Sequence, residues 1–128
     1  KQRTCVRLTM IKGINMKDLE GYASLIKKGN PEFIEIKAYM FVGASQQRLK
    51  RENMPEHIEV VDFTRLLAGF LEDYEVVSEH EPSRVVMMAK KKFKREGKWF
   101  TWIDFPKFQE LATSGKEFTS MDYLKETP

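Results

Sequence analysis

The segment Glu32–Gly43 reads EFIEIKAYMFVG, and it determines the fold more than any other part of the sequence. Its isoleucines and aromatic residues, interrupted by single charged residues, are typical of a β-strand that ends at a glycine. The polar, basic segment 44–54 follows, and a helix is expected over 55–74. The sequence therefore predicts a buried strand that opens into a cationic loop.

A helix is expected immediately before this strand, over residues 15–31. Its apolar residues recur at helical spacing, Asn15 is placed to cap its start, and Gly29 and Pro31 are placed to end it. The β-rich segment 5–13 precedes the helix. Strand, helix and strand in this order predict a βαβ unit with two parallel strands.

The second half of the chain predicts hairpins and a short helix. The expected elements are strands at 75–79 and 84–93, a hairpin turn at Glu96–Gly97, a strand at 99–103 that pairs back, a helix at 105–115 capped by Asp104, and a loosely attached tail at 116–128. Two parallel strands bury little surface alone, since parallel sheets need both faces covered. The fold class is therefore α/β, as part of a larger sheet or barrel.

The composition limits the kinds of protein and site. The chain has 128 residues, 32% of them charged, a net charge of +3, and no apolar run of the roughly 18 residues that a membrane span needs. Cys5 is the only cysteine and there are two histidines, so this chain lacks the ligands of a four-ligand zinc site or an iron–sulfur cluster. A reducing, cytoplasmic setting is expected. Because the first residue is Lys1, we expect a fragment or a processed product.

Polar residues follow both parallel strands, where α/β folds bind ligands. Lys12 and Asn15 follow the first strand, and Gly43 and Ser45 follow the second. Lys12 could hold a phosphate or carboxylate, form a Schiff base, or be solvated. Asn15 could cap the helix or contact a ligand. In the loop behind, Arg48, Asn53 and His57 could contact phosphates and bases, or lie in a solvated loop.

The segment 90–99, KKKFKREGKW, is the strongest electrostatic feature of the sequence. Its lysines and arginine could neutralise RNA phosphates while the interleaved aromatic rings stack on bases. A charged edge strand that discourages pairing with other sheets is the alternative. A second polar cluster, Glu79 to Arg84, predicts an ordinary ion pair between a glutamate and the arginine.

Several segments in order along the chain resemble one family, the tRNA 4-demethylwyosine synthases. The similar segments are LTMIKGINM (8–16), PEFIEIKAYMFVGAS (31–45), RLKRENMPEHIEVVDF (48–63), SEHEPSRVV (78–86) and KWFTWIDFPKFQEL (98–111). Together they cover roughly residues 6–112 and resemble the C-terminal part of these enzymes. The YMFVG sequence is typical of an archaeal member.

The resemblance implies the C-terminal part of a partial (β/α) radical S-adenosylmethionine barrel with an added β-hairpin and a C-terminal helix. Residues 1–54 would hold the last βαβ strands, residues 55–115 the wyosine-specific segment, and residues 116–128 the tail. The implied enzyme is a lyase. Its reaction condenses N1-methylguanosine 37 of phenylalanine tRNA with two carbons of pyruvate. The product is 4-demethylwyosine.

The resemblance also implies cofactors and site residues. S-adenosylmethionine and 4Fe-4S clusters serve the complete enzyme, but the cluster motif C-x3-C-x2-C is absent here, so the N-terminal part of the enzyme must supply it and this fragment alone should be inactive. The residues expected near S-adenosylmethionine or the target base are Lys12, Asn15, Gly43 and Ser45. The residues expected to bind tRNA are Arg48, Asn53 and His57 at the anticodon loop, and Lys91, Lys92, Lys94 and Arg95 at phosphates. Catalytic residues are not assigned, and no metal ligand is expected in this chain.

Two other functions remain open from the sequence. A stand-alone RNA-binding module would use the basic segment as its contact and need no further partner. A β/α-barrel enzyme of the aldolase type would instead use Lys12 as a Schiff-base nucleophile.

Overall fold

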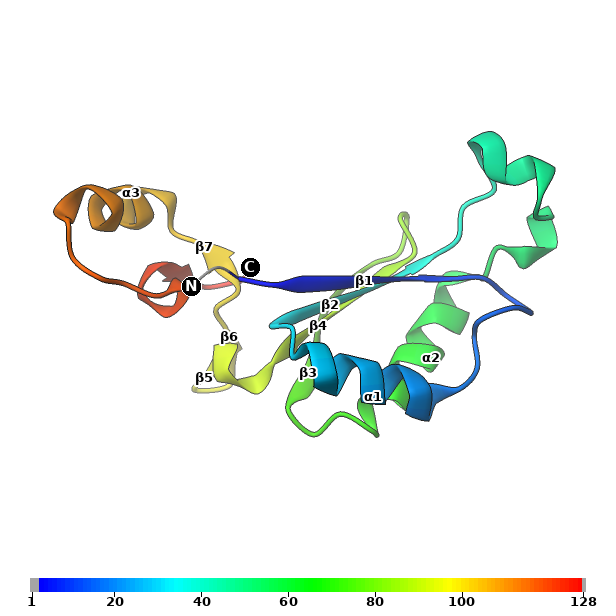
Figure 1. The fold of residues 1–128 in the computed structure, drawn as a ribbon, viewed down its shortest axis with the longest axis horizontal. Coiled ribbons are helices and arrows are strands. Elements are labelled where there is room, and N and C mark those ends of the chain that lie inside the picture. Colours follow the sequence, from blue (N-terminus) through cyan, green and yellow to red (C-terminus); the bar gives the residue numbers. More distant parts are fainter. Residues whose placement is uncertain (1–2, 128) are drawn as a thin grey trace.

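The computed structural model describes residues 3–127, and its main part is a four-stranded sheet with two helices on one face (Figure 1). Its elements are β1 (Cys5–Met10), α1 (Leu19–Gly29), β2 (Phe33–Ala38), α2 (His57–Ala68), β3 (Tyr74–His80) and β4 (Val85–Lys90). The strand order is β1-β2-β4-β3, with β1 parallel to β2 and β4 antiparallel to both of its neighbours. The predicted parallel βαβ unit is therefore present, and β4 is inserted beside it.

The core lies between this sheet and the helices. Alternate residues of β2, namely Ile34, Ile36 and Ala38, are fully buried, as the two-residue period of a strand requires. Val60 and Leu67 of α2 are buried against them in the same cluster. Each such aliphatic side chain contributes about 1.5–3 kcal/mol when fully buried, so this layer holds the two helices on the sheet.

The other face of the sheet is only partly covered. Glu35 and Lys37 of β2 lie on this face and are half-buried. The guanidinium of Arg7 on β1 lies 3.0 Å from the Glu35 carboxylate, and Lys37 is flanked by Thr9 and Val85 in the strand register. This polar, half-open face distinguishes the sheet from one that is complete on both sides.

The start of α1 differs from the prediction. Asp18, rather than Asn15, caps the helix, and its carboxylate accepts a hydrogen bond from the Gly21 amide at 3.2 Å. Asn15 cannot serve as the cap because its amide group is bound to the backbone of the turn after β1. At the other end, Gly29 is the last helical residue and Asn30 takes the left-handed cap position expected for Gly29, with a φ of 50°.

Residues 91–127 form a small C-terminal unit beside the amino ends of β1 and β2 (Figure 1). Its elements are η3 (Lys91–Phe93), β5 (Lys94–Arg95), β6 (Lys98–Trp99), β7 (Trp102–Ile103), α3 (Phe105–Ser114), η4 (Ser120–Tyr123) and β8 (Leu124–Lys125). The predicted turn at Glu96–Gly97 joins β5 to β6, and Asp104 caps α3 as expected.

Two predictions for this unit are wrong. The strand expected over 84–93 ends at Lys90, where the chain turns into η3. Only the start of the segment 99–103 pairs back as expected, with Trp99 opposite Lys94 and the Phe100 amide donating to the Phe93 carbonyl at 2.8 Å, whereas Trp102 and Ile103 do not. Instead, β7 pairs with β8 from the expected tail. Tyr123 is buried there, with its ring 5.0 Å from that of Phe108, so residues 119–127 are packed rather than loosely attached; residue 128 lies outside the described residues.

None of the helices in the described part of the chain combines the length and the hydrophobicity that crossing a membrane requires.

Candidate functional site

Three polar segments meet at the end of the sheet where β1, β2 and β3 finish. These strands run in the same direction, because β2 and β3 are both antiparallel to β4 and β1 is parallel to β2. The segments are residues 11–18, 39–56 and 81–84, and we call them together the rim (right-hand side of Figure 1). Backbone hydrogen bonds from Tyr39 to Met10 and from Ala38 to Arg84 hold them in contact. The predicted meeting of the first two segments is therefore present, and the third was not predicted.

Asn53 fastens the long loop of the rim onto the end of β1. This residue closes the short helix η2 (Arg51–Asn53). Its carbonyl accepts from the Lys12 amide at 2.8 Å, and its side-chain amide donates to the Lys12 carbonyl at 3.0 Å. Its side-chain oxygen also accepts from the Lys50 amide at 2.8 Å. All of these contacts are within the chain, so the immediate role of Asn53 is to position the loop.

Lys12 forms an ion pair with a residue that the sequence did not single out. Its ammonium lies 3.2 Å from the carboxylate of Glu59 on α2, and about half of the lysine side chain is exposed. A hydrogen bond from the Glu56 amide, followed by the charges of Lys12 and Arg84, lowers the pKa of Glu59 below its ordinary value of 4.5. Glu59 thus stays ionised and ties α2 to the end of β1.

Asn15, Gly43 and Ser45 also lie at the rim. The side-chain oxygen of Asn15 accepts from the Ile11 amide at 2.6 Å, and its nitrogen donates to the Thr9 carbonyl at 2.9 Å. The Ser45 hydroxyl accepts from the Tyr39 hydroxyl at 2.8 Å and donates to the Val42 carbonyl at 2.6 Å. The polar atoms of Asn15 and Ser45 are therefore engaged by their own chain.

Gly43 opens the short helix η1 (Gly43–Gln47) and leaves free space beside its backbone. It has a φ of 60°, which favours glycine, and a Cβ placed there would meet no atom within 4 Å. Arg48 follows η1 with an exposed side chain. Both residues are therefore accessible to a ligand.

His57, at the first position of α2, lies against the end of β3. Only 13% of its side chain is exposed, and its Nε2 is 3.3 Å from the Glu79 carboxylate. Within the described residues, its Nδ1 is buried without a hydrogen-bond partner. The sequence shows both residues as polar but not their contact, because it joins β3 to α2.

A pocket of about 600 Å³ opens between the start of α2 and the turn that joins β3 to β4. We call it the rim pocket; it is lined by Glu56, His57, Ile58, Glu81, Pro82 and Arg84. The ion pair predicted between Arg84 and a neighbouring glutamate is not among the ion pairs of residues 3–127. The Arg84 guanidinium instead donates to the Pro55 carbonyl at 2.7 Å. This pocket joins the second polar cluster of the sequence to the rim.

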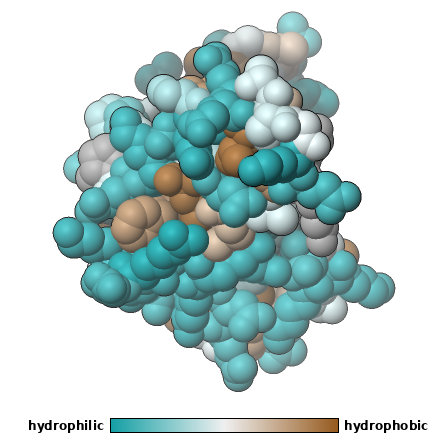
Figure 2. Space-filling view, turned by 90° about the vertical axis from the view of Figure 1, so that its left-hand side faces the viewer, coloured by the Kyte–Doolittle hydropathy of each residue, from teal (hydrophilic) through white to brown (hydrophobic). Residues whose placement is uncertain are grey.

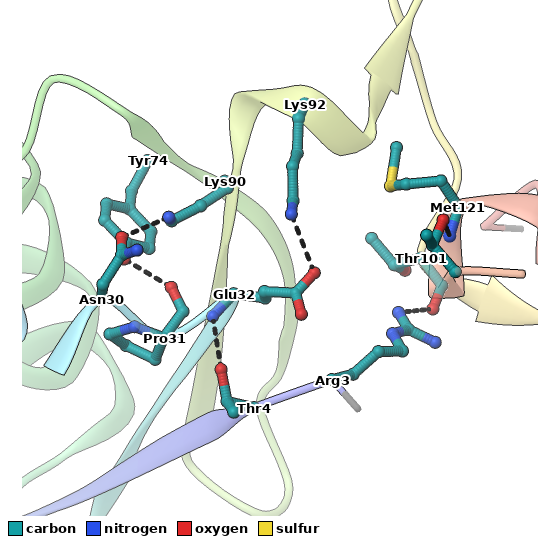
Figure 3. Close-up of polar contacts among 11 residues, drawn as sticks. Arg3, Thr4, Asn30, Pro31, Glu32, Tyr74, Lys90, Lys92, Thr101 and Met121 are labelled. Carbon is teal, nitrogen blue, oxygen red and sulfur yellow. Dashed lines mark hydrogen bonds and ion pairs between the residues drawn. The ribbon is translucent and has the colours of Figure 1, made fainter. Parts of the chain in front are cut away.

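The basic segment lies at the opposite end of the sheet, beside the amino ends of β1 and β2 (Figure 3). Lys92 lies 3.1 Å from the Glu32 carboxylate and Lys94 lies 3.0 Å from that of Glu75. Lys91 and Arg95 are exposed and form no ion pair with any residue in the described part of the chain. The structure therefore divides the predicted RNA-binding residues into two groups, one at each end of the sheet.

Arg3 joins the sheet to the C-terminal unit, a role that the sequence did not reveal. Its guanidinium lies over the rings of Phe33, at 4.5 Å, and Phe93, at 5.5 Å, and it donates to the Thr101 carbonyl (Figure 3). Burial lowers the pKa of Arg3. Figure 2 views the molecule from this end, where the surface is mostly hydrophilic and interrupted by hydrophobic patches.

No metal centre is formed by the described residues, among which no three histidine, cysteine or acidic side chains cluster. Cys5 is exposed, and partial desolvation together with the Glu35 carboxylate raises the pKa of its thiol. A raised pKa disfavours the thiolate that nucleophilic and metal-binding cysteines need.

Comparison with known proteins gives consistent matches over this whole arrangement. A family model described as wyosine base formation matches residues 28–90. An S-adenosyl-L-methionine-dependent tRNA 4-demethylwyosine synthase from Oryza sativa subsp. japonica is 49% identical over 99% of this chain and 20% of its own length. The corresponding protein of Danio rerio, TYW1, is 45% identical over 100% of this chain and 18% of its own length. The chain thus spans about a fifth of these curated relatives.

Two solved structures have the same fold. A structure of TYW1 with a lysine-pyruvate adduct bound is 33% identical, with a TM-score of 0.63 over 76% of this chain and 30% of that one. A crystal structure of archaeal TYW1 is 27% identical, with a TM-score of 0.58 over the same shares. The curated relatives named above come from a plant and a fish, so the expectation of an archaeal source is not supported. The resemblance to the C-terminal part of the tRNA 4-demethylwyosine synthases is confirmed, and the chain belongs to this family.

Proposed function

We propose that this chain forms the substrate-side, C-terminal portion of a cytoplasmic enzyme of the lyase class that makes 4-demethylwyosine in tRNA. The reaction would condense N1-methylguanosine 37 of phenylalanine tRNA with two carbons of pyruvate. The names of the relatives support tRNA as the substrate and a dependence on S-adenosylmethionine. The lysine-pyruvate adduct in a solved relative supports pyruvate as the second substrate.

The observation that carries this proposal is the meeting of three polar segments at the carboxyl ends of β1, β2 and β3. Enzymes of the α/β classes place their sites at this end of the sheet. The half-open face with Arg7, Glu35 and Lys37 would then be part of the inner wall of a partial barrel. The free edge of β1 is where the rest of such a barrel would join.

The residues of this chain fit only part of the cofactor set. Bound S-adenosylmethionine and a 4Fe-4S cluster would supply the radical that starts the reaction. Cys5 alone cannot hold a cluster, so we assign the cluster ligands to the N-terminal part of the enzyme and expect this chain alone to be inactive. Gly43 and Lys12 could line the mouth beside S-adenosylmethionine or the target base, whereas Asn15 and Ser45 would shape it through their bonds within the chain.

Two groups of residues would hold the tRNA. At the rim, Arg48 and His57 would approach the anticodon loop while Asn53 positions the loop that carries Arg48. At the other end of the sheet, the cations at 91, 92, 94 and 95 would neutralise phosphates farther along the tRNA. Lys12 is ion-paired and half-exposed, unlike the buried, unpaired lysine that Schiff-base chemistry favours, so the aldolase alternative loses support.

The proposal is tested by comparing the complete enzyme with this chain alone. Each would be incubated with S-adenosylmethionine, a reductant, pyruvate and phenylalanine tRNA that carries N1-methylguanosine 37. Mass spectrometry of the digested nucleosides should detect 4-demethylwyosine with the complete enzyme and none with the chain. Absence of product with an enzyme whose clusters are shown spectroscopically to be intact would contradict the proposed function, and tRNA binding by the chain alone would favour the RNA-binding module.

A further inference from the structure

The rim pocket has the chemical character of a site for a planar heterocycle. Ile58, which is 57% exposed, and Pro82 provide the apolar surface of the pocket. A cationic fork, Arg84, and a carboxylate, Glu81, lie on the same turn between β3 and β4. Ligand pockets combine apolar surface with directed polar groups, and here the polar residues, Glu56, His57, Glu81 and Arg84, outnumber the apolar ones.

The backbone conformation of Arg84 does not favour arginine over other residues. Its φ is 51°, in the left-handed region that glycine adopts most easily, and its carbonyl and amide both bond within the turn and to β2. Among residues 3–127 its side chain makes one hydrogen bond, to the Pro55 carbonyl, so its remaining N–H donors are available. Arginine donors in a fork match the O6 and N7 acceptors of guanine.

Glu81 complements Arg84. Its side chain is exposed and makes no ion pair with the residues that the structure describes, while its carbonyl accepts the Arg84 amide at 3.0 Å. A carboxylate accepts hydrogen bonds from an exocyclic amine of a base. His57, held by Glu79, also lines the pocket.

We propose that the rim pocket binds the target guanine base, with Arg84 donating to its O6 edge and Glu81 accepting from its exocyclic amine. This inference rests on the proposed function, because the substrate base comes from it. It adds the residues that distinguish guanine from other bases, and it places them on the turn between β3 and β4 rather than in the long loop of the rim.

The test measures binding of two anticodon stem-loop RNAs to the complete enzyme. One carries N1-methylguanosine at the target position and the other carries N1-methylinosine, which lacks only the exocyclic amine. The wild-type enzyme should bind the first about tenfold more tightly, the scale of one good base contact. Glu81→Ala should bring the ratio close to one, whereas Arg84→Gly should weaken both RNAs by about tenfold and leave the ratio unchanged.

Matched variants separate recognition from folding. Arg84→Gly relieves a left-handed backbone position but removes the bond to the carbonyl of the buried Pro55, so its Tm should stay close to that of the wild type. Glu96→Gly at the far hairpin, where Glu96 also has a φ of 51°, should keep the wild-type Tm or raise it. Glu117→Ala, in an exposed segment of the C-terminal unit, should keep the wild-type ratio of affinities. Equal binding of the two RNAs by the wild type, an unchanged ratio in Glu81→Ala, or wild-type binding by Arg84→Gly would overturn the inference.

The outcomes also separate this inference from the proposed function. If the wild type makes 4-demethylwyosine while the two variants bind both RNAs like the wild type, the pocket assignment alone is wrong. If the wild type makes no product but distinguishes the RNAs as described, the pocket assignment stands as base recognition and the proposed reaction is wrong.

Discussion

The two ends of the sheet carry similar cationic residues but use them differently. At the amino ends, Lys92 and Lys94 are paired with Glu32 and Glu75, and Phe93 of the same segment packs against Phe33 and Arg3. At the carboxyl ends, the loops of the rim leave Arg48 exposed and the pocket beside Arg84 open. A count of basic residues favours the amino end as the site, but the contacts show that many of its charges are balanced locally. Charge that is already paired contributes less to binding a ligand than charge that is left free.

The largest expected effect tests whether the amino end is a structural joint. Phe93 is fully buried and stacked on Phe33 with ring centroids 4.8 Å apart. Phe93→Ala should lower the free energy of unfolding by about 3–5 kcal/mol, because it leaves a cavity where the C-terminal unit meets the sheet. Chemical denaturation of the complete enzyme would measure this loss, with Phe105→Ala, at a side chain that is 64% exposed, as the control with little change.

A substitution that loosens the long loop of the rim should lower the activity of the enzyme more than its stability. Asn53→Ala removes two side-chain hydrogen bonds that hold the loop, so we expect a loss of about 1–3 kcal/mol in the free energy of unfolding. Hydrogen exchange at the Lys12 amide should speed up, and product formation should fall further than the stability loss explains. Gln46→Ala, on the exposed side of η1, is the control. Unchanged exchange at Lys12 would show that the loop is held by other contacts.

A pair of double variants compares free with paired cations in the basic segment. Lys91→Ala with Arg95→Ala should lower the affinity for tRNA and reduce the salt dependence of log K by about two, since both cations are free to contact phosphates. Lys92→Ala with Lys94→Ala should change the slope less and instead lower stability, by at most about 1 kcal/mol for the exposed Lys94–Glu75 pair and by more for Lys92–Glu32, whose carboxylate is only 13% exposed. Equal slopes for the two double variants would contradict this division.

The smallest effect concerns pH. The pKa of Glu59 is lowered in the folded protein, so ionised Glu59 contributes stability above its unfolded value, and this contribution is lost as the pH falls through the lowered pKa. In Glu59→Gln, the decrease in Tm between pH 5 and pH 3 should therefore be smaller than in the wild type. Parallel melting curves across this range would measure the difference. Glu110→Gln, on the exposed surface of α3, should behave like the wild type.

Local patterns in the sequence predicted the helices and strands better than they predicted which strands pair. The strand expected at 32–43 and the helix expected at 55–74 are present but shorter, as Phe33–Ala38 and His57–Ala68, and with the Asp104 cap they follow from residue spacing and capping chemistry, which act over a few residues. The insertion of β4 between β2 and β3, and the pairing of β7 with β8, depend on contacts between distant segments. The Asn15 cap failed for a local reason, because the turn directly after β1 uses that side chain.

The candidate site was predicted in part for the same physical reason. Lys12, Asn15, Gly43 and Ser45 follow strands that the sequence identified as parallel, so their meeting could be inferred. Glu59 and Arg84 reach the rim from a helix face and from a turn between antiparallel strands. Their spacing along the chain carries no sign of this meeting, since an antiparallel hairpin can be placed at either edge of the pair.

The irregularity in β3 gives the sheet two unlike edges. The register between β3 and β4 shifts between Val76 and Ser78, and Ser78 to His80 are exposed. A bulged, charged edge resists the addition of another strand, whereas β1 at the opposite edge pairs regularly with β2 over all six of its residues. The sheet can therefore grow in one direction only. Any additional strand, from the same polypeptide or from a second copy, would pair with β1 and not with β3.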